Sequence, residues 1–398
     1  MNNHLPSPAL SPPKLACRHF PACGGCQTLD IPYSRQLSEK QAGLAGKFQA
    51  LADVPLWDIL PSPATAGYRH KVQLPFGQSN SKVTLGCYAA DSHRVVDQEV
   101  CLVQDRELTA CVIALRGWAN HHGLTVYDEK NRQGLLRHLI LRKAWGTGEI
   151  LAGVVVNTPA GTALPHAEDA VERLRAALEN RADALKGLLQ MHNTLPTNTV
   201  LGPEETLVWG EAAIHESLDG LRFRLGISTF FQINPFQAPR LFDAGTSRLR
   251  AGMRVLDLYC GAGAFTLWAA RRTGSAEGWE ENAASAQAAR DAAGLNGLET
   301  ACLFQTGEIA ALIAGKSRPF SDFDAVLVDP PRKGLEKPVV ESLVAEGPEQ
   351  ITYISCNPNS LIRDLSLLAA AYSIDGVQPV DMMPHTRHLE CVAHLTRR

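Results

Sequence analysis

Cys356 and Glu390, both near the C-terminus, are the residues whose types and positions best suit covalent chemistry. Cys356 directly follows an apolar, strand-like run at residues 351–354 and is itself followed by Asn357 and Pro358. Enzymes with parallel sheets place their chemistry at the carboxyl ends of strands, and a thiolate is a good nucleophile that also leaves readily. Glu390 lies on a turn between two apolar stretches, where a carboxylate can remove a proton. A buried, unreactive thiol and an ordinary surface carboxylate are the alternative interpretations.

Neighbouring residues compete for both roles. Cys260 lies inside a glycine-rich loop. Cys391 opens a predicted strand beside the candidate base, so its side chain should point to the opposite face. His385 and His388 are close in sequence and are rival candidates for the base. The nucleophile and base named above remain the favoured pair.

A second group of thiols lies near the N-terminus. Cys17, Cys23 and Cys26 are close together, and the two glycines before Cys26 would let the backbone wrap around an inorganic centre. Cys101 is the candidate fourth ligand, brought there by folding rather than by local spacing. In a reducing compartment cysteines rarely form disulfides, and four thiolates suit zinc or an iron-sulfur cluster. The spacing differs from the usual zinc-ribbon pairs, and free buried thiols are a further alternative.

Residues 254–266 have the pattern of a β-strand that runs into a glycine-rich turn and then an apolar helix. Gly261 and Gly263 allow a ligand close to the backbone, and Glu280 ends the next predicted strand, where a carboxylate can bind ribose hydroxyls. Thr266 stands where dinucleotide-binding loops have a third glycine, which argues against a nicotinamide enzyme. An ordinary tight turn and a charge at a helix N-terminus are the simpler alternatives.

The elements that would position these residues follow a leader. Residues 1–16 are rich in proline and small residues, which predicts a disordered leader. Residues 17–60 hold three of the cysteines and a predicted helix, and residues 61–225 are predicted to form a mostly β central domain. The predicted elements of these two segments are a helix at 31–51, strands at 71–75, 83–88, 135–143 and 149–156, at least one helix within 166–192, and short strands within 201–225.

Residues 226–398 are predicted to form an α/β domain. Strand-like runs at 255–259, 325–328 and 351–355 alternate with helical ones, of which the first is at 235–249. This alternation is typical of a doubly wound sheet. The predicted fold class is therefore α/β, with the smaller β domain before it.

The composition excludes several classes of protein. Of 398 residues, 45% are hydrophobic and 20% charged, and the net charge is -3. No apolar run approaches the roughly 18 residues of a membrane span, and no secretory signal is visible, so we expect a cytoplasmic protein without membrane contact. With this charge, any nucleic acid must bind a local basic patch. Residues 68–71 and 135–143 supply cations for one, and Arg137 is expected to present a basic strand edge to phosphates.

Several motifs together resemble the RNA uracil-5-methyltransferase family, in the family's order and from Cys17 onward. They are Phe230-Phe-Gln-Ile-Asn-Pro, the glycine-rich loop, Asp329-Pro-Pro-Arg-Lys-Gly, Ser355-Cys-Asn-Pro and His388-Leu-Glu. The resemblance implies a class I methyltransferase fold for residues 226–398, S-adenosylmethionine as cofactor, and a central domain that binds RNA. It also implies that Gln232, Tyr259, Glu280 and Asp329 line the cofactor site.

In such an enzyme Cys356 would add to carbon 6 of uracil, and Glu390 would remove the proton from carbon 5 after methyl transfer. The uracil must be unstacked to meet the thiol, which favours a loop in folded RNA. A methyltransferase of exocyclic nitrogen is an alternative enzyme. A non-catalytic iron-sulfur protein that binds RNA is an alternative from another class.

The resemblance further implies a 4Fe-4S cluster on Cys17, Cys23, Cys26 and Cys101. Family members that act on tRNA typically lack these cysteines, and one ribosomal branch has an additional N-terminal barrel for which there is no room before Cys17. The chain is therefore most similar to the shorter enzymes of 23S rRNA, with uracil 747 as the expected target. A site of the 1939 type and tRNA are the alternatives. We expect a monomer without an obligate protein partner.

Overall fold

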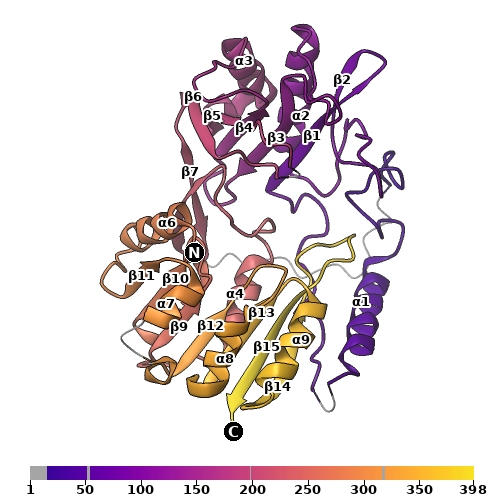
Figure 1. Ribbon diagram of the computed structural model, residues 1–398. Helices are drawn as coiled ribbons and strands as arrows, with labels where there is room; N and C mark the ends of the chain where they lie inside the picture. Colours follow the sequence, from indigo (N-terminus) through magenta and orange to yellow (C-terminus); the bar gives the residue numbers. More distant parts are fainter. Residues whose placement is uncertain (1–15, 52–53, 198, 316–318) are drawn as a thin grey trace.

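A computed structural model describes residues 16–51, 54–197, 199–315 and 319–398 (Figure 1). The predicted leader lies outside these ranges except for its last residue. Two large sheets dominate the described chain, one central and one C-terminal, and a two-stranded hairpin packs against both. The hairpin consists of β7 (Ala213–Leu218) and β8 (Leu221–Gly226).

The central sheet has six strands in the order β2-β1-β3-β4-β5-β6. They are β1 (Lys71–Ser79), β2 (Lys82–Leu85), β3 (Leu136–Lys143), β4 (Ile150–Val156), β5 (Leu185–His192) and β6 (Glu204–Gly210). Neighbours are antiparallel except for β4 and β5, which are parallel. This parallel pair is connected through α3 (Ala167–Ala177) and the 3-10 helix η1 (Glu179–Ala184).

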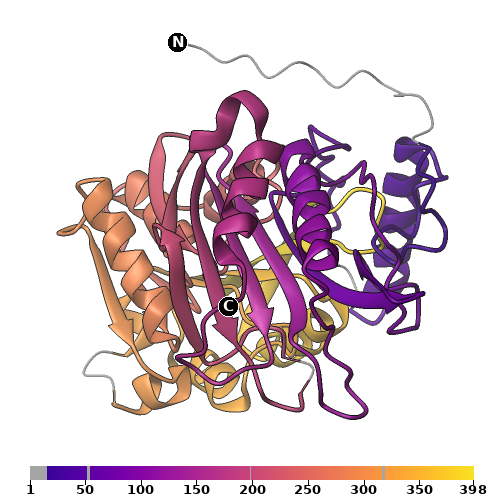
Figure 2. The same cartoon turned by 90° about the horizontal axis from the view of Figure 1, so that it is seen from above.

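Alternate residues of the central strands enter two different cores. In β3, Leu139 and Leu141 pack under α3 and α2 (Arg106–His121), whereas Ile140 packs toward the hairpin. The Asp105 side chain caps α2 by accepting hydrogen bonds from the first backbone N–H groups of the helix. Both helices cover the face of the central sheet that is turned away from the C-terminal sheet (Figure 2).

The central region contains more helix than the sequence predicts. The prediction of a strand-rich stretch omits α2, although its buried residues Leu108, Val112, Leu115 and Ala119 recur at helical spacing behind the N-cap Asp105. Residues 185–192 form strand β5 instead of continuing the predicted helix, since β5 is buried along nearly its whole length and shows no alternation. Strands covered on both faces read as continuous apolar runs, and such runs resemble buried helices.

The C-terminal sheet has seven strands in the order β11-β10-β9-β12-β13-β15-β14. They are β9 (Val255–Leu258), β10 (Ala276–Glu280), β11 (Cys302–Thr306), β12 (Ala325–Val328), β13 (Gln350–Ser355), β14 (Tyr372–Val380) and β15 (Glu390–Arg397). The first five in this order are parallel, and β15 is antiparallel to both of its neighbours. Strand order reverses between β9 and β12, and ligands of doubly wound sheets bind at such a point.

Helices cover both faces of the C-terminal sheet, as the predicted α/β class requires. One face carries α4 (Ala238–Thr246), α5 (Ala264–Thr273) and α6 (Ala283–Leu295). The other carries α7 (Ile309–Gly315), η2 (Phe320–Asp322), α8 (Lys337–Glu346) and α9 (Pro358–Leu368). Among the described residues, no helix is long and apolar enough to cross a membrane.

The N-terminal helix α1 (Tyr33–Phe48) packs on the C-terminal sheet rather than on the central one, beside α9 (Figure 1). Leu44 and Phe48 share a core with residues of β12 and β13. Lys40 Nζ lies 2.7 Å from Asp381 Oδ1, and both side chains are buried. The first and last parts of the described chain therefore form one layered unit.

Candidate active site and cysteine site

The ends of three neighbouring strands bring the predicted catalytic residues to one edge of the C-terminal sheet. Strand β13 lies between β12 and β15, with Ser355 paired to Cys391. Asp329 directly follows β12, Cys356 directly follows β13, and Glu390 is the first residue of β15. Because an antiparallel register continues outward by one residue on each strand, Cys356 and Glu390 lie opposite each other.

Burial and charge control the protonation of this edge. Burial, together with the neighbouring Asp329, raises the pKa of Glu390 to about 8. Burial also raises the pKa of Asp329 to about 7. Burial and the charge of Glu390 raise the pKa of the Cys356 thiol. Near neutral pH the free site therefore retains protons, and the thiol must lose one before it can attack.

Arg332 is the cation of this edge, and the sequence analysis does not single it out. Its guanidinium hydrogen-bonds with Cys356, and its charge lowers the pKa of both Cys356 and Glu390. The Arg332 carbonyl accepts a hydrogen bond from Asn357 Nδ2 at 2.9 Å, which joins the turn after β12 to the turn after β13. In the sequence, this arginine follows the strand-end Asp329 by three residues, and that spacing is the signal that could have identified it.

Three of the four rival residues are buried or held by other contacts, whereas His388 is exposed. Cys391 is fully buried, and burial raises the pKa of the Cys260 thiol well above its usual value. His385 Nδ1 lies 2.9 Å from Gln36 Nε2, and its Nε2 lies 3.0 Å from the Thr65 carbonyl. That imidazole thus anchors α1 and does not compete with Glu390 for the position opposite the thiol.

The turn between β9 and α5 lies at the point where strand order reverses. Tyr259 has a φ of 63°, which is uncommon for a residue with a side chain. A Cβ at Gly263 would lie 2.9 Å from the Cβ of Ala289, so the close approach of α6 requires glycine there. Glu280, at the end of β10, accepts a hydrogen bond of 2.9 Å from Gly261 N–H. Its carboxylate holds the turn and keeps lone pairs for further donors.

A cavity of about 40 Å³ opens beside this turn, and Gln232, Tyr259 and Asp329 line it. Glu280 lies behind the turn and is not part of the lining. Within the described residues, the buried Tyr259 hydroxyl has no hydrogen-bond partner. Such a group is costly unless a ligand or water satisfies it. A ligand that enters here would find an unsatisfied polar group, and aromatic rings complete the wall of the cavity.

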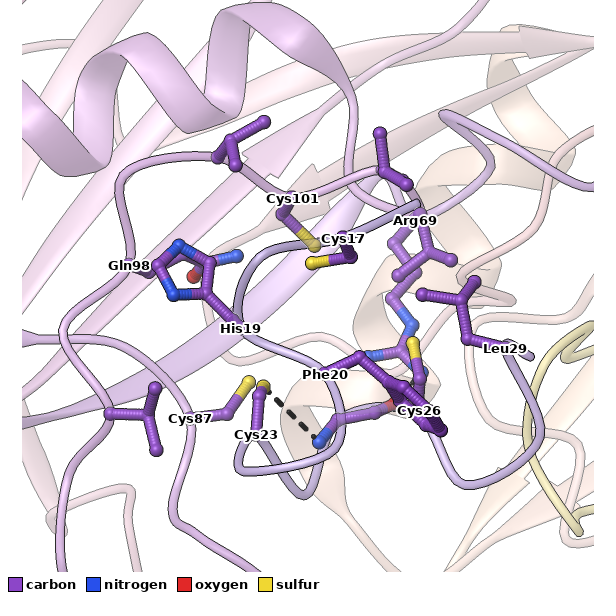
Figure 3. A pocket seen from close by; sticks show the side chains of 15 residues that line it. Cys17, His19, Phe20, Cys23, Cys26, Leu29, Arg69, Cys87, Gln98 and Cys101 are labelled. Carbon is purple, nitrogen blue, oxygen red and sulfur yellow. Dashed lines mark hydrogen bonds between the residues drawn. The ribbon is translucent and has the colours of Figure 1, made fainter. Parts of the chain in front are cut away.

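Five thiols line one cavity beside the central region (Figure 3). The cavity has a volume of about 30 Å³, and its thiols are the predicted ligands Cys17, Cys23, Cys26 and Cys101 together with Cys87. The sequence analysis does not single out Cys87, because it is isolated from the N-terminal group along the chain. A hydrogen bond with Cys87 is the main cause that lowers the pKa of Cys23 to about 6. Figure 3 shows these two thiols side by side.

A glycine and an arginine complete this cavity. A Cβ at Gly25 would lie 3.2 Å from Cys87 Sγ and 3.4 Å from Cys23 Sγ, so a side chain there would crowd both sulfurs. Arg69 donates a hydrogen bond of 2.8 Å to the Gly25 carbonyl. Its charge opposes the burial that raises the pKa of Cys26 to about 11. The missing side chain of Gly25 and the positive charge of Arg69 thus both favour an electron-rich group in this cavity.

In the ranges that the structure describes, no three histidine, cysteine, aspartate or glutamate side chains are grouped tightly enough to hold a metal ion. Zinc binds sulfur at about 2.3 Å, so a zinc site needs its thiols in a small tetrahedron. The thiols here surround a cavity instead.

The expectation that Arg137 presents a basic edge to phosphates is wrong. Arg137 is 7% exposed and donates hydrogen bonds to the carbonyls of Asn193, at 2.7 Å, and Leu195, at 2.9 Å. Its guanidinium also lies over the ring of Tyr127, 4.4 Å from the centroid. Because β3 is an interior strand covered on both faces, its cations serve the fold.

A doubly wound sheet with a ligand cavity where strand order reverses, and a thiol beside a carboxyl group at the same edge, defines a class I methyltransferase. Comparison with known proteins agrees. Residues 244–398 match the family model described as tRNA (Uracil-5-)-methyltransferase. A protein of Leptospira interrogans named as an uncharacterized RNA methyltransferase is 36% identical over 396 residues, which are 97% of this chain and 99% of the relative. One from Gloeobacter violaceus is 38% identical over 383 residues, 94% of this chain and 81% of the relative.

A solved structure is similar over nearly the whole chain. The tRNA (uracil-54, C5)-methyltransferase of Pyrococcus abyssi, in complex with S-adenosyl-L-homocysteine, has a TM-score of 0.77 and 26% identity, and the match covers 94% of this chain and 85% of that one. The chain belongs to the RNA uracil-5-methyltransferase family and is an S-adenosylmethionine-dependent enzyme. The family predicted from the motifs and the α/β methyltransferase fold are thereby confirmed.

Proposed function

We propose that this enzyme methylates carbon 5 of a uracil in RNA through a transient covalent bond between Cys356 and the base. The observation that carries the proposal is the position of Cys356 opposite Glu390, with Arg332 against the thiol. A methyltransferase that acts on the lone pair of an exocyclic nitrogen needs no nucleophilic thiol. The family match supports the same choice.

The proposed reaction needs one nucleophilic addition, one methyl transfer and one proton transfer. The Cys356 thiolate adds to carbon 6, and the electron pair of the ring double bond becomes available at carbon 5. Carbon 5 takes the methyl group, and Glu390 then accepts the proton that carbon 5 still carries. The electrons of that C–H bond restore the double bond and expel Cys356 as a thiolate. Glu390 finally releases its proton to water.

We propose that Gln232, Tyr259 and Asp329 contact S-adenosylmethionine in the cavity beside the β9–α5 turn, and that Glu280 accepts hydrogen bonds from its ribose. When bound, the cofactor supplies an electrophilic methyl group on a sulfonium. The unpartnered Tyr259 hydroxyl and the free lone pairs of Glu280 support this arrangement. Asp329 lines the cofactor cavity and also lies near Glu390, so this one residue can border both the cofactor and the target base.

We also propose that Cys17, Cys23, Cys26 and Cys101 hold a 4Fe-4S cluster. The convergence of these thiols on one cavity supports it, as does Gly25, where any side chain would crowd two of the sulfurs. A cluster would supply covalent links between the N-terminal segment and the central region. Its role would be structural, because the methyl transfer proposed above needs no redox step.

The proposed substrate is 23S rRNA, with uracil 747 as the target. The cysteine set supports a ribosomal substrate, since family members that act on tRNA typically lack it. A tRNA is the second candidate, because the similar enzyme of Pyrococcus abyssi is a tRNA methyltransferase. Mass mapping of modified uracils in 23S rRNA and tRNA, from cells with and without this protein, distinguishes the two. Loss of 5-methyluridine from tRNA alone would contradict the ribosomal target.

RNA that carries 5-fluorouracil at the target position tests the covalent step. Fluorine in place of the carbon 5 proton blocks the last proton removal, so wild-type protein should form an adduct that survives denaturing electrophoresis. Cys356→Ala should form none. Cys391→Ala is the matched control, because Cys391 lies beside Glu390 with its side chain buried on the opposite face. An adduct with the Cys356→Ala protein would contradict the proposal.

A further inference from the structure

Trp145 is a large aromatic side chain that is left open between the central region and the methyltransferase sheet. It lies in the turn between β3 and β4, and 48% of the residue is exposed. Its ring contacts Phe236 at a centroid distance of 4.4 Å and His70 at 5.5 Å, both at steep angles. Neither neighbour lies flat on the indole, so ring surface remains available for a further planar group.

The turn that carries Trp145 is held rigidly. The backbone N–H groups of Trp145 and Gly146 each donate a hydrogen bond of 2.7 Å to a different oxygen of the Glu216 carboxylate. Glu216 belongs to the hairpin strand β7 and is only 4% exposed. A buried carboxylate that accepts two charge-assisted bonds gives a well-defined position. The indole is therefore preorganised, which lowers the cost of binding a partner.

The indole is also close to the proposed active site. Its neighbour Phe236 is four residues beyond Gln232, which lines the cofactor cavity, so at most about 14 Å of extended chain separates them. Lys71 and Arg142 both donate to the carbonyl of Thr229, at the start of the same segment. This anchors the segment to the central sheet.

The charge around the indole permits a polyanion. Glu216, Asp105 and Glu107 are the carboxyl groups near the indole; Lys143 Nζ lies within 2.8 Å of Asp105 and 2.7 Å of Glu107, and Arg142 lies near Glu216. Arg142 adds positive charge next to this pair, whereas burial lowers the pKa of Lys71 to about 7, so that amine is only partly charged near neutral pH. Their combined charge does not oppose phosphate groups.

We propose that Trp145 is a stacking platform for an unpaired base next to the target uracil in the RNA substrate. The inference rests on the proposed function and extends it to substrate recognition. A uracil that leaves its stack deprives its neighbours of stacking contacts, and aromatic side chains in RNA-binding proteins replace such contacts. A rigid, half-exposed indole beside the cofactor segment has the position and chemistry for this task.

Trp145→Ala and Trp145→Phe test the platform on the stem-loop RNA that the wild-type enzyme methylates. Stacking on an aromatic side chain changes base affinity about 5- to 150-fold. We expect the Kd for RNA to rise by such a factor in Trp145→Ala and much less in Trp145→Phe, with kcat at saturating RNA nearly unchanged. Trp57→Ala is the matched control, because Trp57 is 41% exposed but lies beside the edge strand β14. Its RNA affinity should equal that of the wild type.

Abasic substitutions in the RNA identify the stacked base. At the nucleotide that stacks on Trp145, loss of the base should weaken wild-type binding but should not weaken Trp145→Ala further. Additive effects at every flanking position would overturn the proposal, as would wild-type affinity of Trp145→Ala. A change in oligomeric state of Trp145→Ala without loss of RNA affinity would instead assign the indole to contact between two copies, and would also overturn it.

The same measurements separate the platform from the function on which it rests. If the wild-type enzyme methylates the RNA but Trp145→Ala is indistinguishable from it, only the platform is wrong. If the wild-type enzyme binds no RNA, the proposed function itself is wrong. Unchanged binding of S-adenosylmethionine by Trp145→Ala serves as the folding control.

Discussion

The catalytic edge and the cysteine site both place a thiol beside an arginine, yet their other neighbours differ. Cys356 faces two carboxyl groups, those of Asp329 and Glu390. Among the described residues, each cysteine of the cysteine cavity has four other thiols around the same space, and no carboxylate lines that cavity. Carboxyl groups next to a thiol allow proton transfer, whereas several thiols around one space favour a shared inorganic centre. The neighbours of a cysteine, more than the thiol itself, therefore indicate its chemistry.

Removal of the proposed nucleophile should have the largest effect. Cys356→Ala is expected to lower kcat by about 10⁴-fold or more, as for other covalent nucleophiles, because carbon 5 of uracil is then not activated. Single-turnover methyl transfer from labelled S-adenosylmethionine measures it. Cys101→Ser, from the other thiol group, is the comparison and should retain most of kcat in the folded enzyme. Equal losses of kcat in the two variants would show that the two thiol sites do not differ in their part in methyl transfer.

Glu390→Gln should slow the reaction at a later step. An amide cannot accept the proton of carbon 5, so we expect a loss of about 10²- to 10⁴-fold in turnover. The methylated RNA should remain attached to Cys356, and denaturing electrophoresis of ordinary uracil RNA with this variant detects it. His388→Gln is a control for a rival base. Accumulation of the adduct in the His388 variant alone would assign proton removal to that imidazole.

The dependence on pH should reveal the raised pKa of Glu390. That carboxyl is protonated below its pKa of about 8, and the pKa of the Cys356 thiol is raised too, so kcat/KM should rise with pH through pH 8 and should go on rising above it. Arg332 lowers the pKa of Glu390 and of Cys356, so Arg332→Gln should move the rise to higher pH. Arg332→Lys, which keeps the charge, should move it less. Identical pH profiles of kcat/KM for all three proteins would show that Arg332 does not influence these two ionisations.

The smallest effect on turnover is expected in the cysteine site, where the readout is iron. Cys101→Ser should lose most of the iron and sulfide bound after anaerobic purification, because a proposed ligand is gone. Cys87→Ser is the matched control from the same cavity and should retain both. Iron loss in Cys87→Ser with retention in Cys101→Ser would show that the fourth ligand is Cys87.

The meeting of Cys356 and Glu390 at one sheet edge can be predicted from the sequence because regular elements build that edge. Cys356 follows the carboxyl end of the apolar strand β13, and Glu390 begins β15, which runs antiparallel to β13, so both residues lie at the same edge of the sheet. The same reasoning locates the turn after β9. Arg332 is harder to predict, because it lies on an irregular turn and its contact with Cys356 depends on how that turn folds back.

The remaining features depend on contacts between distant residues. Cys87 joins the thiol cavity only because the strand-end loop at residue 87 packs against residues 23–25. Arg137 carries the charge expected of an RNA contact, but the coverage of both sheet faces that buries it is set by the whole domain. Periodicity in a single sequence does not contain this information.

The packing of α1 on the C-terminal sheet determines which fragments of this protein can fold by themselves. A fragment that starts at residue 226 would contain every proposed catalytic residue, but it would uncover the apolar surface beneath Leu44 and Phe48. It would also leave the buried Asp381 carboxylate without its Lys40 and Tyr33 partners. Such a fragment should be insoluble when produced by itself, and residues 17–60 supplied as a separate chain should cover only part of its exposed surface, because the β7–β8 hairpin is missing as well.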